Sequence, residues 1–116
     1  MDKKIEEIIQ RIKKFRDERD WMQFHDHKSM AVSLVLEAAE VLEHFQWKSK
    51  EETAKYGKEK KEEIGEELAD VAIYLIEMAD NLGIDLTEAI GKKMDKNEKK
   101  YPVEKAKGRH NKYNDL

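Results

Sequence analysis

The sequence contains almost no residues that would interrupt a helix. Its single proline is Pro102, and two of its five glycines, Gly57 and Gly83, stand where the apolar pattern also breaks. No segment alternates apolar and polar residues as a half-buried strand does. Apolar residues recur instead at three- and four-residue spacing, as they do along one face of a helix. The sequence therefore predicts an all-α protein.

The apolar spacing divides the chain into four long helices. They are expected over about residues 2–19, 28–45, 61–82 and 85–102. The second and third are apolar around most of their circumference, which predicts deeper burial than a surface helix has. Residues 48–60 are expected to form a charged connector or to begin the next helix, and the last fourteen residues are polar. We expect a four-helix bundle domain over residues 1–102, followed by a polar C-terminal tail over 103–116.

Length and charge limit the classes of function that the chain can serve. A chain of 116 residues suits one domain, and a net charge of −3 offers no general attraction to a nucleic acid polymer. The chain has no cysteine, which removes disulfides and thiolate chemistry and favours the cytoplasm. No stretch approaches the roughly 18 apolar residues of a membrane span, and the start has no apolar core of signal-peptide type. We expect a soluble, cytoplasmic protein that binds no membrane.

Two pairs of acids interrupt the most apolar helices. Glu37 and Glu40 lie within LVLEAAEVLEHFQW, and Glu67 and Asp70 lie within EELADVAIYL. In each pair the two side chains project about 60° apart on a helix, so they share a face. Acid pairs are commonplace on a wetted face, but these acids are bounded by Leu and Val, where an unpaired charge costs several kcal/mol. A cation is needed to neutralise them.

The residue types of the two acidic segments indicate which cation that is. Neither segment contains lysine or arginine, and four carboxylates meeting between two helices would repel one another. Oxygen ligands without cysteine or paired histidines favour Mg²⁺ or Mn²⁺ over zinc or copper. Mg²⁺ commonly completes its coordination with substrate phosphates. The sequence therefore predicts a phosphate-bearing small-molecule ligand.

The spacing of the acids also resembles a known signature. Glu37-x-x-Glu40, followed after 26 intervening residues by Glu67-x-x-Asp70, is similar to the motif of the all-α nucleoside triphosphate pyrophosphohydrolases, the MazG-like superfamily. Within it, the dCTP pyrophosphatase branch is resembled most closely. Four blocks carry this resemblance in order: ERDWMQFH (18–25), EAAEVLEHFQW (37–47), EELADVAIYL (66–75) and KMDKNEKKYP (93–102). The resemblance covers nearly the whole chain.

The resemblance implies an activity and an assembly. It implies hydrolysis of a deoxynucleoside triphosphate, with dCTP or a modified deoxycytidine triphosphate favoured, to the monophosphate and pyrophosphate, which would cleanse the nucleotide pool. It assigns catalysis and Mg²⁺ binding, with Mn²⁺ as a possible substitute, to the four acids Glu37, Glu40, Glu67 and Asp70. It also implies a homotetramer built from paired dimers, an assembly consistent with the two helices that are apolar on most of their surface.

The resemblance further implies the residues that bind substrate. Those for the base are Trp21, Gln23, His25, Trp47 and Tyr74, and those for the outer phosphates are Lys93 and Asn97. Aromatic side chains can stack on a flat pyrimidine ring, and the lysine ammonium can form charge-assisted hydrogen bonds to phosphate. The resemblance loosens at residues 27–29, where His-Lys-Ser replaces the usual proline, basic residue and asparagine.

Other readings of the same residues remain open. Within the enzyme class, the alternatives are a broad-specificity and a dUTP-preferring pyrophosphatase. Outside it, the acids would be structural parts of a non-catalytic helical interaction module. A di-iron carboxylate protein is disfavoured, because neither acidic pair contains the Glu-x-x-His spacing of such sites.

Overall fold

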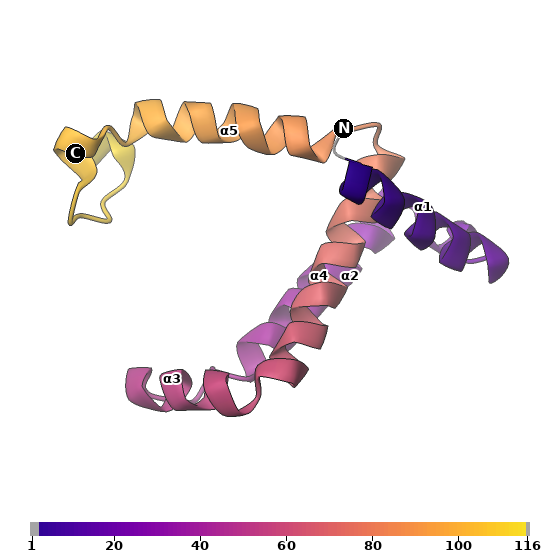
Figure 1. The fold of residues 1–116 in the computed structure, drawn as a ribbon, viewed down its shortest axis with the longest axis horizontal. Helices are drawn as coiled ribbons and strands as arrows, with labels where there is room; N and C mark the ends of the chain where they lie inside the picture. Colours follow the sequence, from indigo (N-terminus) through magenta and orange to yellow (C-terminus); the bar gives the residue numbers. More distant parts are fainter. Residues whose placement is uncertain (1–2, 116) are drawn as a thin grey trace.

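The computed structural model describes residues 3–115, and all of its regular structure there is helical (Figure 1). The elements are α1 (Lys3–Glu18), η1 (Met22–Phe24), α2 (His27–Glu43), α3 (Lys50–Glu59), α4 (Lys61–Asn81), α5 (Leu86–Lys100), α6 (Val103–Ala106) and η2 (Tyr113–Asp115). No strand occurs within residues 3–115. The prediction of an all-α fold is confirmed.

The segment expected to be a charged connector or the start of the next helix forms a separate helix, α3. Ser49 Oγ accepts from the Glu52 amide and the Glu52 carboxylate accepts from the Ser49 amide, both at 3.2 Å, which completes a capping box. The expected break at Gly57 does not occur, because this glycine lies inside α3. The break falls at Lys60 instead, where α3 ends and α4 begins.

The turn between α4 and α5 follows the expected pattern. Gly83 has φ +70°, a left-handed conformation that favours glycine, and the Ile84 amide donates to the Ala79 carbonyl at 2.8 Å. The Asp85 carboxylate then accepts from the Glu88 amide at 3.2 Å and caps α5. Glycine and aspartate together therefore define where one helix stops and the next starts.

The helices are packed unevenly. α2 and α4 lie side by side along most of their length, α1 crosses α4 near its end, and α3 contacts α4 near its start (Figure 1). α5 projects away from this group, so its far end stands clear of the other long helices (Figure 1). The four long helices that the sequence predicts are all present, but the bundle formed by one chain is open where α5 departs.

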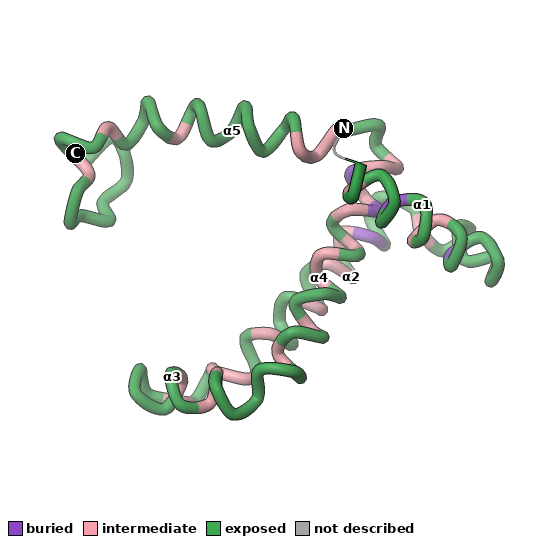
Figure 2. Tube along the Cα trace, in the orientation of Figure 1, coloured by how far each residue is buried: buried purple, intermediate pink, exposed green. Residues whose placement is uncertain are grey.

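Little apolar surface is buried within one chain. Among residues 3–115 the buried apolar side chains are Ile9, Met30 and Ala79, which lie where α1 meets α2 and α4 (Figure 2). The deep burial expected for the second and third predicted helices is not found, since Val35 of α2 is 67% exposed and Leu68 of α4 is 53% exposed. The reason is that α2 and α4 have only each other as a partner over much of their length.

The segment predicted to be a polar tail folds back on the end of α5. The rings of Tyr101 and Tyr113 are 6.4 Å apart in an edge-to-face arrangement, and Lys100 Nζ lies 5.0 Å from the centre of the Tyr113 ring. The division at residue 102 stays a prediction. Residues 1, 2 and 116, which the predicted domain and tail include, lie outside the described residues. No helix within the described range is long and apolar enough to cross a bilayer.

Candidate active site

The two predicted acid pairs lie near one another where α2 packs against α4. Burial raises the pKa of the Glu37 carboxyl, and the neighbouring carboxyls of Glu40, Asp70 and Glu67 raise this pKa further. Each of the three must be close enough to Glu37 to disfavour its charge. One Glu37 oxygen, Oε2, is buried and has no hydrogen-bond partner among the described residues. The fold thus brings four carboxylates together and provides no hydrogen-bond donor to one oxygen of Glu37.

Glu67 has a neighbour to which the sequence analysis gave no role. His44 Nε2 lies 2.7 Å from Glu67 Oε2, at ion-pair distance but without the alignment of a hydrogen bond. His44 Nδ1 lies 2.7 Å from the Tyr56 hydroxyl on α3. The capping box that forms α3 therefore brings a tyrosine to the histidine beside the acids. Tyr56 is distant from His44 on the predicted connector, so no sequence spacing indicated this contact.

The acids do not form a ready-made metal cage. In the described part of the chain, no group of three or more histidine, aspartate or glutamate side chains is arranged to hold a metal ion by itself. The donor set of the four acids is nevertheless all oxygen, the type that Mg²⁺ and Mn²⁺ take. Such ions keep water and take up substrate phosphates, so an incomplete set of protein ligands suits them better than it suits zinc.

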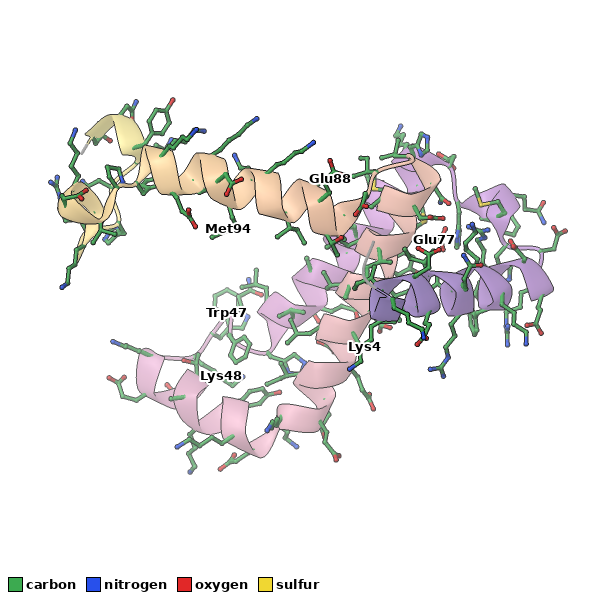
Figure 3. The ribbon with its side chains drawn as sticks, turned by 45° about the horizontal axis from the view of Figure 1, so that its top comes forward. Lys4, Trp47, Lys48, Glu77, Glu88 and Met94 are labelled. Atoms are coloured by element: carbon green, nitrogen blue, oxygen red, sulfur yellow. The ribbon has the colours of Figure 1, made fainter. Side chains whose placement is uncertain are left out.

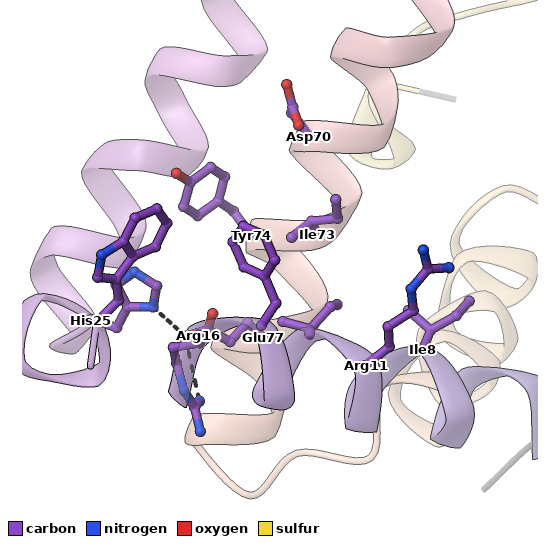
Figure 4. Close-up of a pocket in the computed structure, with 11 residues that line it drawn as sticks. Ile8, Arg11, Arg16, His25, Asp70, Ile73, Tyr74 and Glu77 are labelled. Carbon is purple, nitrogen blue, oxygen red and sulfur yellow. Dashed lines mark hydrogen bonds and ion pairs between the residues drawn. The ribbon is translucent and has the colours of Figure 1, made fainter. Parts of the chain in front are cut away.

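A cavity of about 500 Å³ lies between α1, η1 and α4 (Figure 4). Its lining includes three of the residues predicted to bind the base, Trp21, His25 and Tyr74, and one of the predicted metal ligands, Asp70. Asp70, Tyr74 and Glu77 follow one another at four- and three-residue steps, so they share one face of α4. From α1 the lining receives three apolar side chains and two arginines: Ile8, Ile12, Phe15, Arg11 and Arg16. The cavity therefore extends from Asp70, one of the four predicted metal ligands, to the buried carboxyl of Glu77.

The other predicted substrate residues do not line this cavity within one chain. Gln23 donates instead to the backbone carbonyl of Asp20 at 2.9 Å and to its carboxylate at 3.2 Å. Trp47 is 87% exposed beyond the end of α2, far from Glu77 (Figure 3). Lys93 and Asn97 are on α5, which leads away from the packed helices (Figure 1). One chain thus brings together only part of the predicted set.

Glu77 at the far end of the cavity was not identified from the sequence. It is 4% exposed, yet it lies among apolar residues of the third predicted helix. Its partners are Arg16 on α1, His25 after η1 and Asn81 one turn along α4. The one available signal was a glutamate seven residues after Asp70 on the same helical face.

Known proteins resemble the chain over most of its length. The sequence profile of the MazG-like family matches residues 32–116. The rat (Rattus norvegicus) protein named dCTP pyrophosphatase 1 is 41% identical over 114 residues, which cover 97% of this chain and 67% of the relative. The human (Homo sapiens) dCTP pyrophosphatase 1 is 39% identical over the same coverage. The crystal structure of a pyrophosphatase from Archaeoglobus fulgidus superposes with a TM-score of 0.83 and 43% identity, covering 88% of this chain and 95% of that one.

Proposed function

We propose that this chain acts on deoxynucleoside triphosphates and prefers dCTP or a modified form of it. The chain belongs to the MazG-like family and is a nucleoside triphosphate pyrophosphohydrolase. The products would be the deoxynucleoside monophosphate and pyrophosphate. The observation that carries the proposal is the gathering of four carboxylates beside a cavity walled by aromatic side chains. About 40% identity to proteins named dCTP pyrophosphatase 1 supports the choice of base.

The cofactor belongs to the proposal. Glu37, Glu40, Glu67 and Asp70 would hold Mg²⁺, with Mn²⁺ as a possible substitute. The bound ion would neutralise charge on the triphosphate and lower the pKa of a water that attacks phosphorus. Two observations support this assignment: the pKa of Glu37, which burial and then the neighbouring carboxyls raise, and the partnerless oxygen of the same side chain. A nearby cation would stabilise the charged form of the Glu37 carboxyl, which its present neighbours disfavour.

The chain's own residues would orient the substrate along α4. Trp21 and Tyr74 line the cavity and offer aromatic surface to a pyrimidine ring. Asp70 lines the same cavity on the side of the acid group, so the triphosphate would lie there and the base toward His25 and Glu77. The seven residues from Asp70 to Glu77 span about 10 Å of helix. The apolar walls would exclude water from the base.

An assembly of several copies would bring together the predicted substrate residues that one chain leaves apart. We propose a homotetramer, a dimer of dimers, because α2 and α4 expose apolar side chains that a second copy would cover, among them Val35, Leu36 and Leu68. In such an assembly Lys93 and Asn97 of α5 would contact the phosphates at a site formed with another copy. We further propose a cytoplasmic protein that acts on small nucleotides and binds no nucleic acid polymer.

The alternatives divide into two groups. The non-catalytic interaction module and the di-iron protein are set aside, because the chain's relatives are pyrophosphatases over nearly its whole length. A broad-specificity or dUTP-preferring pyrophosphatase remains the second candidate. Trp21 and Tyr74 would stack on any pyrimidine, so aromatic walls alone do not choose between cytosine and uracil.

The experiment is a substrate screen. Purified protein is incubated with each canonical and several modified nucleoside triphosphates in the presence of Mg²⁺, and pyrophosphate and orthophosphate are followed separately. We expect pyrophosphate release, fastest with a deoxycytidine triphosphate and abolished by EDTA. Glu67→Gln should be inactive, whereas Glu62→Gln, an exposed acid on the same helix, should retain activity. Orthophosphate as the first product, or equal activity of Glu67→Gln, would overturn the proposal.

A further inference from the structure

Two hydrogen-bonding groups and one guanidinium converge on one oxygen of Glu77 at the end of the cavity. His25 Nδ1 lies 2.7 Å from Glu77 Oε2 and Arg16 Nη1 lies 3.7 Å from it (Figure 4). Asn81 Nδ2 donates to the same oxygen at 3.0 Å. Glu77 is 4% exposed and Arg16 is 6% exposed. The cluster is therefore shielded from bulk water, where such contacts are stronger than at the surface.

The partners of these donors establish which atoms carry hydrogen. The Asn81 amide oxygen accepts from Arg16 Nη1 at 3.2 Å, so the amide nitrogen must point toward Glu77. Arg16 also donates twice to Asp17, at 2.8 and 3.2 Å, and these bonds raise the pKa of the guanidinium. A Glu77 oxygen that accepts from an amide beside a guanidinium acts as a carboxylate oxygen.

This arrangement dictates the chemistry of His25. A carboxylate can only accept, so the imidazole hydrogen facing Glu77 is on Nδ1. A neutral imidazole bonded through Nδ1–H has a bare Nε2 that accepts a hydrogen bond. His25 lines the cavity, so Nε2 is the ring nitrogen left to meet a ligand there.

We infer that Glu77 is a positioning residue that determines base specificity, because it makes His25 an acceptor and so selects a pyrimidine with an amino group at C4. Cytosine presents an amino donor at that position, whereas uracil and thymine present a carbonyl acceptor. A bare Nε2 accepts from the first and repels the second. This inference rests on the proposed function, since it names the group that separates dCTP from dUTP at the same site.

The first test reads the histidine directly. Nitrogen NMR of the full-length wild-type protein at about pH 8 reports which ring nitrogen bears hydrogen, and the His25→Asn variant identifies the His25 signals by their absence. We expect hydrogen on Nδ1 alone. Hydrogen on Nε2, or on both nitrogens, would overturn the inference whether or not the protein hydrolyses any nucleotide.

The second test measures discrimination. The ratio of kcat/KM for dCTP to that for dUTP should fall roughly 10-fold in Glu77→Ala, the size expected for one buried hydrogen bond, and the His25 hydrogen should redistribute toward Nε2. Glu88→Ala removes an acid paired with Lys92 at 2.7 Å on exposed α5 and should leave the ratio unchanged. Circular dichroism confirms that each variant is folded.

The outcomes separate this inference from the proposed function. If wild type releases pyrophosphate from dCTP but the ratio in Glu77→Ala equals the wild-type ratio, the inference fails and the proposed function stands. If wild type acts on dCTP and dUTP equally, the inference fails as well. If no nucleotide is hydrolysed, the proposed function fails, and the NMR result on wild type alone decides the tautomer.

Discussion

Glu77 is buried and Glu37 is half-buried, and the two glutamates have opposite surroundings. Every contact of Glu77 Oε2 is with a donor: His25, Asn81 and Arg16. Glu37 has carboxylates for neighbours, its Oε2 lacks a partner, and its pKa is raised. The first acid completes a network within the chain, while the second has the properties of a group that requires a ligand. The difference teaches that burial of an acid alone indicates neither structure nor catalysis, and that its partners do.

The largest effect should follow from changing the acid without partners. Glu37→Gln should lower pyrophosphate release by roughly 100-fold or more, as expected when the ligand shell of a metal is damaged, because the amide cannot offset a cation. Its stability in urea should equal or exceed that of wild type, since charge repulsion is relieved. A variant that is both active and less stable would reverse the roles given to the two acids.

Replacing Glu77, the acid with partners, should lower the stability of the fold, unlike replacing Glu37. Glu77→Ala should reduce the free energy of unfolding by about 2 kcal/mol, because Arg16 and His25 are left in a shielded site without their acceptor. Urea unfolding at fixed protein concentration measures this. Glu88→Ala, which breaks an exposed pair, should cost well under that amount. Equal losses in the two variants would contradict the account of the Glu77 network.

The stabilisation of the fold by bound Mg²⁺ should depend on Glu37 and not on Glu77. At a free concentration ten times its dissociation constant, a bound ion adds about 1.4 kcal/mol to the stability of the folded state. We expect this gain, measured as a higher melting temperature, in wild type and in Glu77→Ala, and its loss in Glu37→Gln. A gain of the same size in all three proteins would locate the ion elsewhere.

The smallest effect should be a dependence of stability on pH. Because the folded-state pKa of Glu37 lies above its unfolded value, the folded state holds the proton more tightly. Without metal, this group should make the protein less stable as pH rises from the unfolded pKa through the folded one, and the effect is complete above that range. Urea titrations over mildly acidic pH should show a shallower dependence in Glu37→Gln. An identical dependence would remove Glu37 from the account.

The sequence predicted what depends on local periodicity. Helix spacing identified the four long helices, and it put Glu67, Asp70 and Tyr74 along α4. Ser49 and Glu52 have the spacing of a capping box and so indicate the start of α3, whereas its dense charge also fits a connector. Glycine was an ambiguous guide: Gly83 ends a helix through its positive φ, whereas Gly57 continues one.

The features of the site that the sequence did not predict depend on contacts between residues far apart in the chain. Glu77 and His25 are 52 residues apart, and Arg16 and Asn81 are 65 apart, so no spacing rule connects them. The His44 contact with Tyr56 exists only because α3 folds as a helix. The exposed apolar faces of α2 would be covered only in the proposed assembly, and one sequence read alone does not place a second copy.

The central claim is that carboxylates from α2 and α4 together hold a divalent ion against a triphosphate. The most direct measurement is a crystal structure with Mn²⁺ and a non-hydrolysable dCTP analogue, in which anomalous scattering locates the metal. The account predicts Mn²⁺ in contact with phosphate oxygens and with carboxylates from both helices, Glu37 among them. Mn²⁺ held by phosphates or by other side chains, with Glu37 and Glu67 uncoordinated, would contradict it.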